Sequence, residues 1–429
     1  MSYSNDSRPH YRSVKYSIIT FGCRVNQADS MAIARDLHAR GAVETTPDDA
    51  ELVVINSCSV TATADQGVRQ TVRRIVRDNP SVRVVITGCY ATRRPDEVRQ
   101  LPNVAHVVTN DAKDDLVHRL GPSIGLRHHE EQTTAVRYGY GDGPCGDSLS
   151  PGTVGRTALT LRVQTGCDEM CSYCIIPTTR GKGRSRPLNE VVQQIENAVA
   201  SGYREVAIAG VHLGSYGRDL NGSTSLTALV RTLAEWDADV LFRISSLEPM
   251  DCGPAIVDMV AASPRLAPHF HLPLQSGADA VLRAMRRPYT ASSFAALVTH
   301  IRERIPHASI GSDLIVGFPG ESCAHFDETE MLLRDLPLTH LHVFPYSDRP
   351  GTDAAALGAR VDGAVIRERG QRIRDIGHQM STRFRQSQRG TTRRALTIDD
   401  GWSAVTDNYL KVKLEIRHSR NEWVQVAID

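Results

Sequence analysis

The sequence lacks the features that mark membrane and secreted proteins. Its apolar runs are well short of the roughly 18 consecutive residues that span a bilayer. Its first residues, MSYSNDSRPHYRSVKY, contain no apolar stretch of the kind found in a secretory signal. Apolar residues make up 41% and charged residues 23% of the 429 residues, which is typical of a folded globular chain. We therefore expect a cytoplasmic protein without a membrane partner and, at this length, about three domains.

The chain also lacks a net charge large enough to indicate its partner. Fifty basic and 49 acidic residues leave a formal charge of +1, which neither favours nor excludes a nucleic acid. Two short segments are nevertheless strongly basic, namely 180–186 (RGKGRSR) and 381–394 (STRFRQSQRGTTRR). Either segment alone could equally be a solvent-exposed basic surface or a binding site for an anionic ligand. Two such segments in one near-neutral chain favour an anionic ligand such as RNA.

Apolar strands alternate with helical patterns from residue 15 to about 120. The expected strands are 16–22, 51–56 and 83–87, and helical patterns cover 28–41 and 64–79. Such alternation predicts a parallel sheet with helices on its faces, and the valine and isoleucine runs indicate strands buried on both sides. Residues 1–120 are therefore an N-terminal α/β domain with a parallel sheet. Residues 121–155, rich in Gly, Ser, Pro and charge, are expected to be a linker or mobile loop.

A second alternating series fills residues 156–386. Six strands are expected, near 157–164, 205–211, 241–246, 269–274, 308–316 and 340–345, with helical patterns such as 188–202 and 292–305 between them. Six βα units are too few for an eight-stranded barrel and predict an open, partial (β/α)6 barrel. Short alternating strands from about 387 to 429 predict a small all-β domain, so the fold class is α/β with this addition.

The nine cysteines are not expected to form disulfides in a cytoplasmic chain, so metal binding or catalysis is favoured. Cys23, Cys58 and Cys89 each follow an expected strand of the first series. Because parallel strands end along one edge, these thiols are expected to meet there and to hold a soft metal or an iron–sulfur cluster. Buried apolar packing and zinc remain alternatives, although zinc cysteines usually come as close pairs, which this region lacks. We treat Cys145, Cys252 and Cys323, which have no pattern, as incidental.

A tighter cluster follows the first strand of the second series. In GCDEMCSYC, Cys167, Cys171 and Cys174 have the spacing C-x₃-C-x₂-C. In a barrel-like fold this loop lies at the C-terminal face, where active sites form. Three cysteine ligands would leave one iron of a 4Fe-4S cluster open to a substrate, and an open position is typical of catalytic metal sites.

This spacing, with Tyr173 in the aromatic position before the third cysteine, resembles the signature of radical S-adenosylmethionine (SAM) enzymes. The resemblance implies that the three cysteines hold a 4Fe-4S cluster, that SAM binds its open iron, and that reduction cleaves SAM to a 5′-deoxyadenosyl radical. It also implies a partial (β/α)6 barrel as the radical SAM core.

The order of motifs along nearly the whole chain resembles one family within that group, the methylthiotransferases. The matching motifs are TFGCRVNQADS, INSCSVTATAD, VVITGCYA, GCDEMCSYCIIP, RGKGRSRP, GVHLGSYGRDL, HLPLQSG, DLIVGFPGE and FPYSDRPGT. The resemblance implies a second 4Fe-4S cluster on Cys23, Cys58 and Cys89, and an OB-like, RNA-binding TRAM domain at residues 387–429.

Two motifs, FGCRVNQ and GVHLGSYG, are most similar to the branch that modifies N6-threonylcarbamoyladenosine in tRNA. This implies methylthiolation of its C2 at position 37 with two SAM molecules. Isopentenyladenosine in tRNA and a ribosomal protein remain alternative substrates. The expected partners are tRNA and a low-potential electron donor of the flavodoxin or ferredoxin type, and the protein is expected to be a monomer.

Other site residues are predicted from their position at strand ends. Gly210, Gly214 and Gly217 are candidates for close approach to SAM, although a tight turn explains them equally well. Gln275 and Asp313 are candidates for hydrogen bonds to SAM or substrate. The candidates for contacts with RNA phosphate are Arg180, Lys182, Arg184, Arg186, Arg383 and Arg385.

Overall fold

The structure is a computed structural model that describes residues 13–121, 157–222 and 224–429. The chain divides into two compact units. The first comprises 1–21, 29–58 and 64–147, and the second comprises 22–28, 59–63 and 148–429. The expected linker from 122 onward and Cys145 lie outside the described residues. The division does not separate 387–429 from the residues before it.

The first unit is built on a five-stranded parallel sheet with the strand order β2-β1-β3-β4-β5. Its strands are β1 (Lys15–Thr20), β2 (Val43–Glu44), β3 (Leu52–Ser57), β4 (Arg83–Gly88) and β5 (Val104–Val108). The three expected strands are confirmed as β1, β3 and β4. The edge strands β2 and β5 were not expected. β2 is only two residues long, whereas β5 has the mostly apolar sequence VAHVV and could have been recognised.

Helices cover both faces of this sheet. They are α1 (Arg24–Ala39), α2 (Ala62–Asp78), α3 (Cys89–Arg93), α4 (Pro95–Arg99) and α5 (Leu116–Leu120), with the 3₁₀ turn η1 (Lys113–Asp115) before α5. Every residue of β3 is buried. Val53 and Ile55 pack with Val68 and Val72 of α2. Alternate residues of a strand point to opposite faces, so Leu52 and Val54, which are also buried, require cover on the other side.

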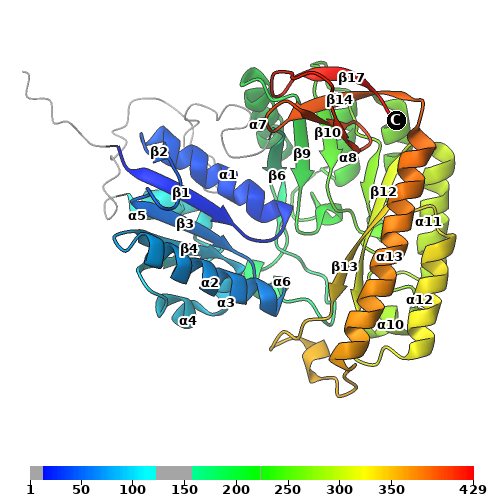
Figure 1. Ribbon diagram of the computed structural model, residues 1–429, viewed down its shortest axis with the longest axis horizontal. Coiled ribbons are helices and arrows are strands. Elements are labelled where there is room, and N and C mark those ends of the chain that lie inside the picture. Colours follow the sequence, from blue (N-terminus) through cyan, green and yellow to red (C-terminus); the bar gives the residue numbers. More distant parts are fainter. Residues whose placement is uncertain (1–12, 122–156, 223) are drawn as a thin grey trace, which may run out of the picture. The chain divides into compact units, whose positions relative to one another are not determined.

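The second unit contains the six expected parallel strands, in two sheets of three. One sheet has the order β10-β9-β6 and the other β11-β12-β13. The strands are β6 (Leu159–Arg162), β9 (Glu205–Ala209), β10 (Leu241–Ile244), β11 (His269–His271), β12 (Ser309–Val316) and β13 (His340–Pro345). A parallel bridge between Phe242 of β10 and Leu266, just before β11, links the two sheets. The open, partial barrel is confirmed (Figure 1).

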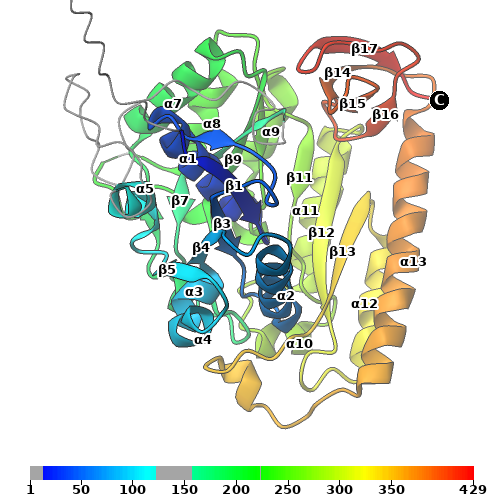
Figure 2. The same ribbon diagram turned by 60° about the vertical axis from the view of Figure 1, so that its left-hand side comes forward.

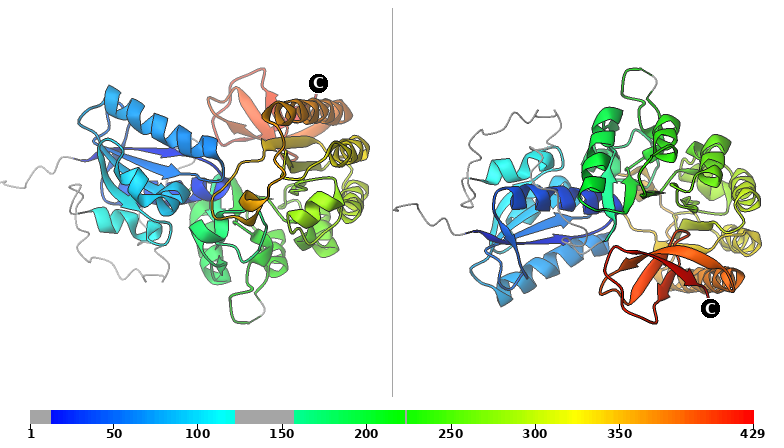
Figure 3. Two further views of the ribbon diagram at one scale, coloured as in Figure 1. Left: turned by 90° about the horizontal axis from the view of Figure 1, so that it is seen from below. Right: turned by 90° about the horizontal axis from the view of Figure 1, so that it is seen from above.

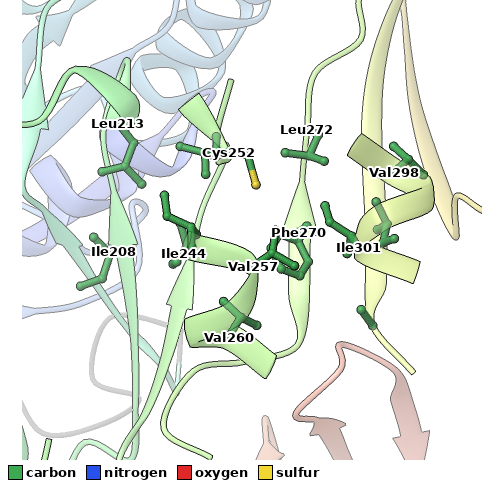
Figure 4. Close-up of a cluster of buried hydrophobic side chains, with 14 of the residues drawn as sticks. Ile208, Leu213, Ile244, Cys252, Val257, Val260, Phe270, Leu272, Val298 and Ile301 are labelled. Atoms are coloured by element: carbon green, nitrogen blue, oxygen red, sulfur yellow. The ribbon is translucent and has the colours of Figure 1, made fainter. Parts of the chain in front are cut away.

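Helices α7 (Leu188–Ala200), α8 (Leu226–Ala234), α9 (Pro254–Ala262), α11 (Ala291–Arg304) and α12 (Cys323–Asp335) lie on the outer side of these strands (Figure 3). The connections contain the short helices α6 (Ile176–Arg180) and α10 (Asp279–Ala284) and the 3₁₀ turns η2 (Leu213–Ser215), η3 (Pro249–Asp251) and η4 (Asp353–Ala356). Between helices and strands lies one apolar core, which includes Ile208, Phe270 and Val298 (Figure 4). Cys252 is buried in this core, in agreement with an incidental, apolar role.

A long helix, α13 (Gly363–Gln388), connects the barrel to the last strands and lies beside β13 and α12 (Figure 1). It packs through Ile373, Ile376, Met380 and Phe384, whose spacing of three to four residues places them on one face. Most of its other residues are polar or charged. Across the described ranges, no helix is both long enough and apolar enough to cross a membrane.

The expected C-terminal β domain is confirmed as a four-stranded antiparallel sheet with the order β16-β15-β14-β17 (Figure 2). Its strands are β14 (Thr392–Ile398), β15 (Ser403–Thr406), β16 (Lys411–Lys413) and β17 (Trp423–Ala427). A small core of Ala395, Ala404, Val412, Val426 and Ile428 holds the sheet together.

Candidate active site

The loop that carries Cys167, Cys171 and Cys174 is closed at its base by a short antiparallel ladder. Strands β7 (Gln164–Thr165) and β8 (Arg184–Ser185) pair with each other on either side of the loop. Within the loop, the backbone N–H of Cys167 donates to the carbonyl of Gly181 at 3.1 Å. The ladder follows β6 directly, so the first barrel strand positions all three thiols.

The three thiols are partly exposed, and they are close enough to influence one another electrostatically. Burial raises the pKa of the Cys174 thiol to about 12 and also raises that of Cys171. Without iron, the thiols of Cys171 and Cys174 are therefore neutral, and iron binding would displace their protons. Three sulfur donors within eight residues fit a 4Fe-4S cluster, because thiolates are the ligands that such clusters take.

Arg287 lies beside this loop and was not identified from the sequence. Its Nη1 donates to the Sγ of Cys171 at 3.1 Å, its Nε donates to the hydroxyl of Tyr289 at 3.0 Å, and its guanidinium pairs with Glu248. Its side chain is only 3% exposed. A buried cation at this position would offset negative charge on the cysteine sulfurs. No local pattern could reveal it, because 116 residues separate Arg287 from Cys171.

His212 lies beside Cys167 and was also not identified from the sequence. Its Nε2 lies 2.8 Å from Oδ2 of Asp251, a residue that also accepts a hydrogen bond from Arg218 at 3.0 Å. Burial alone would lower the pKa of His212, but hydrogen bonds with Asp251 and Cys167 raise it to about 10. His212 is therefore a second cation that is held close to the cysteine loop.

Gly166 is required by the geometry of the loop. Its φ of +73° is one that residues with side chains rarely adopt, and an added Cβ would lie 1.9 Å from the carbonyl oxygen of Lys182. We expect Gly166→Ala to destabilise the protein by about 1–3 kcal/mol and to lower the iron content after reconstitution, because the strained position is next to Cys167. Thermal unfolding and iron analysis measure both effects.

Gly253→Ala is the matched control for that substitution. Gly253 has a φ of −74°, and an added Cβ would meet no atom within 4 Å. Because Gly253 is the N-cap of α9, the free energy of unfolding of this variant should fall by no more than about 1 kcal/mol. Equal iron content in both variants would contradict the role assigned to Gly166.

Close packing explains why glycine stands at the three positions that are candidates for SAM binding. A Cβ on Gly210 would lie 3.0 Å from the Cα of Leu213, and one on Gly214 would lie 2.0 Å from the carboxylate of Asp251. Gly217 has a φ of +89° and would clash with the carbonyl of Thr224. Tight turns therefore account for these residues, and SAM contact remains a prediction for Gly210 and Gly214.

Gln275 has an unusual backbone that agrees with a role in binding. Its φ of +69° lies in the left-handed region, which is uncommon for a residue with a side chain. Backbone hydrogen bonds with Asp313 and Ile315 hold it in place at 2.9 Å each. Strained residues of this kind gather at functional sites.

The ring of Tyr173 packs edge-on against Phe318, with 6.5 Å between centroids. SAM binding by Gln275 and Tyr173 stays a prediction.

Asp313 lies between two imidazoles. Burial alone would raise its pKa, but hydrogen bonds from His271 and His342 lower it to about 2. The carboxylate is therefore ionised and already has two partners. Neither histidine was identified from the sequence.

The three N-terminal cysteines follow neighbouring strands. Ser57 at the end of β3 pairs with Gly88 at the end of β4, so Cys58 and Cys89 occupy equivalent positions one residue later. Both are buried. Gly88 makes this possible, because its φ is +95° and a Cβ would lie 2.2 Å from the carbonyl oxygen of Ser57. Cys23 is exposed and follows β1, the strand that pairs with β3 on its other side.

The basic residues proposed for RNA differ in exposure. Lys182, Arg184, Arg383 and Arg385 are exposed, and Arg186 is half-buried. Arg180 is buried and donates to the hydroxyl of Thr165 at 3.3 Å. Burial makes Arg180 a poor candidate for a phosphate contact, in contrast with the expectation from the sequence, because the segment turns its first basic side chain inward.

Comparison with known families covers both units. Residues 15–110 match a family described as "Uncharacterized protein family UPF0004", and residues 161–333 match the radical SAM superfamily. Among solved structures, the radical S-adenosylmethionine methyltransferase TsrM from Kitasatospora setae aligns with a TM-score of 0.54 at 16% identity. The alignment covers 80% of this chain and 74% of that one, and this likeness supports the fold.

Curated relatives match over almost the full length. Threonylcarbamoyladenosine tRNA methylthiotransferase MtaB of Aquifex aeolicus is 34% identical, over 97% of this chain and 100% of the relative. The protein of the same name in Bacillus subtilis is 32% identical, over 92% of this chain and 88% of the relative. A tRNA-2-methylthio-N(6)-dimethylallyladenosine synthase of Pelotomaculum thermopropionicum is 31% identical, over 89% and 86% respectively.

Proposed function

Because the chain belongs to the methylthiotransferase family of radical SAM enzymes, we propose that it methylthiolates C2 of N6-threonylcarbamoyladenosine at position 37 of tRNA. The observation that carries this proposal is the near full-length match to relatives named for that substrate, at 34% and 32% identity. A second candidate is the dimethylallyl (isopentenyl) form of the nucleoside, which the relative from Pelotomaculum thermopropionicum favours.

The enzyme's cofactors are SAM and 4Fe-4S clusters. We propose that Cys167, Cys171 and Cys174 hold the cluster at which SAM binds. When bound, this pair supplies the radical chemistry that an inert aromatic C–H bond requires. Arg287 would hold the sulfur of Cys171 in position through its hydrogen bond. Being fixed in turn by Glu248 and Tyr289, Arg287 would keep this geometry before SAM arrives.

We further propose that Cys23, Cys58 and Cys89 bind the second cluster, from which the methylthio group is transferred. The support is local, because Cys58 and Cys89 each come one residue after the paired ends of the adjacent strands β3 and β4. Two SAM molecules would be used in each turnover, and a flavodoxin or ferredoxin type donor would supply electrons. The enzyme would act as a monomer in the cytoplasm.

The exposed charges of Lys182 and Arg184, which flank the cysteine loop, are proposed to contact tRNA phosphate. Removing one phosphate contact should reduce the slope of log binding constant against log salt by roughly 0.7–0.9. The double variant Lys182→Gln/Arg184→Gln is therefore expected to reduce this slope by about 1.5 and to bind all tRNAs more weakly. Filter binding at several salt concentrations measures this.

Arg231→Gln is the control for that experiment. Arg231 lies on α8, on the outer side of the barrel, and its side chain is exposed. Its substitution should leave the slope unchanged. An unaltered slope in the double variant would instead assign Lys182 and Arg184 to ordinary solvated surface.

The substrate is tested by mass spectrometry of tRNA nucleosides. Cells that lack the gene should lose 2-methylthio-N6-threonylcarbamoyladenosine, and the gene restored on a plasmid should return it. If the threonylcarbamoyl product persists without a second such enzyme while the 2-methylthio-isopentenyl product disappears, the second candidate is correct. If neither changes, the tRNA substrate is wrong.

A further inference from the structure

One face of the sheet β11-β12-β13 carries an unusual set of histidines. In the ladder, His271 pairs with Gly311, Gly311 with His340, and Asp313 with His342. Side chains on one face alternate with those on the other. The intervening residues, such as Phe270, Ile310 and Leu314, belong to the apolar core against the helices. The histidines and Asp313 therefore face away from the helices, on the inner side of the strand layer.

Three of these residues bring together atoms that could bind a metal ion. Nε2 of His271 and Nδ1 of His342 each lie 3.0 Å from the same oxygen, Oδ1 of Asp313. One ligand atom from each residue lies within 4.8 Å of the others. Metal–nitrogen and metal–oxygen bonds are about 2.0–2.2 Å long, so ligand atoms around one ion are roughly 3 Å apart. Only small side-chain movements would be needed to admit an ion.

The residues around these three side chains resemble the surroundings of known metal ligands. The second ring nitrogen of His271, Nδ1, is hydrogen-bonded to the hydroxyl of Ser246, which fixes the ring with Nε2 toward Asp313. Histidine ligands of metals usually have such a partner on the other nitrogen. The site is also partly open, with exposed fractions of 14% for His271, 23% for Asp313 and 56% for His342.

A third imidazole closes one side of the group. The ring of His340 lies over Gly311, where a Cβ would be 2.0 Å from its Nε2. Its centroid lies 6.4 Å from that of His271 and 5.6 Å from that of His342. His340 therefore borders the group without being one of the three converging residues.

We propose that His271, Asp313 and His342 bind a divalent first-row transition metal ion, separate from the cysteine sites. Two imidazoles and one carboxylate suit zinc or ferrous iron, and three protein ligands leave positions for water or for an oxygen of a substrate. In this proposal Asp313 binds the ion, whereas the sequence predicted a hydrogen bond from it to SAM or substrate. It does not depend on which nucleoside the enzyme modifies.

Zinc is the probe that tests the site. Full-length protein with reconstituted iron–sulfur clusters is washed with a mild chelator, given one equivalent of Zn²⁺ without oxygen, and desalted. We expect about one zinc per chain by elemental analysis. X-ray absorption at the zinc edge should show nitrogen and oxygen neighbours near 2.0–2.1 Å. Asp313→Asn and His342→Ala should each weaken zinc binding by at least about tenfold.

His300→Ala is the matched control, because His300 is an exposed histidine on α11. It should retain its zinc. The absorption spectrum of the clusters shows in every variant that the protein is folded, and no tRNA is needed, so failure here is distinct from failure of the proposed function. The proposal is overturned if no zinc is retained, if its neighbours are sulfur near 2.3 Å, or if both ligand variants bind zinc as the parent does.

Discussion

The Cys171→Ala protein is expected to lose about half of its iron and all reductive cleavage of SAM. One of two similar clusters depends on this sulfur, and with only two cysteines left the cluster at the barrel loop would lack a protein ligand. The thiol also accepts the hydrogen bond of Arg287, so its removal leaves a buried guanidinium without one partner. Iron analysis and the formation of 5′-deoxyadenosine with a chemical reductant measure the two effects.

Cys58→Ala is the informative comparison. It should also lose about half of the iron, but it should still form 5′-deoxyadenosine while producing no methylthiolated tRNA. Cys323→Ser, which alters an exposed cysteine at the start of α12, should behave like the parent in all three assays. If the Cys58→Ala protein kept its full iron content but lost SAM cleavage, Cys58 would not be a ligand of the second cluster.

The second large effect is expected from Lys113→Met, which should destabilise the first unit by roughly 3–5 kcal/mol. Lys113 and Asp29 form an ion pair at 2.9 Å, with side chains only 2% and 0% exposed. The Lys113 ammonium also donates to the side-chain oxygen of Asn56 at 3.0 Å. Removing the cation deprives the buried Asp29 carboxylate of its ammonium partner, and this is the costly step. Denaturant unfolding, with hydrogen exchange of β3 and β4 as the local reporter, measures the change.

A double-mutant cycle separates this cause from simple loss of packing. Lys113→Met/Asp29→Leu removes both charges, so it should recover much of the stability that the single variant loses. The exposed pair of Arg99 and Asp96, with side chains 59% and 89% exposed, is the control and should contribute no more than about 1 kcal/mol. Equal destabilisation in the single and double variants at 113 would contradict the electrostatic account.

Much of the fold could be predicted because its signals are local. The valine and isoleucine runs of β3 and β4 indicate strands, since a strand buried on both faces is apolar over most of its length. The spacing of Cys167, Cys171 and Cys174 within eight residues likewise places their thiols together whatever the rest of the chain does. The alternation of six strands with helices predicts the partial barrel for the same reason.

Other elements have weaker local signals. The edge strand β2 is two residues long and lies at the border of the sheet, where burial does not demand an apolar pattern. The long helix α13 was not predicted as one element, because its mostly polar and charged sequence hides the narrow apolar row from Ile373 to Phe384.

The chain's own order of residues determined where strands, helices and the two sets of cysteines lie, since these depend on periodicity and close spacing. Only the tertiary structure decided which distant groups surround them: Arg287 and His212 beside the cysteine loop, Arg180 turned inward, and the histidines around Asp313. The physical reason is that hydrogen bonds and ion pairs act over a few ångströms in space. Partners separated by many residues meet only when the segments that carry them are brought side by side.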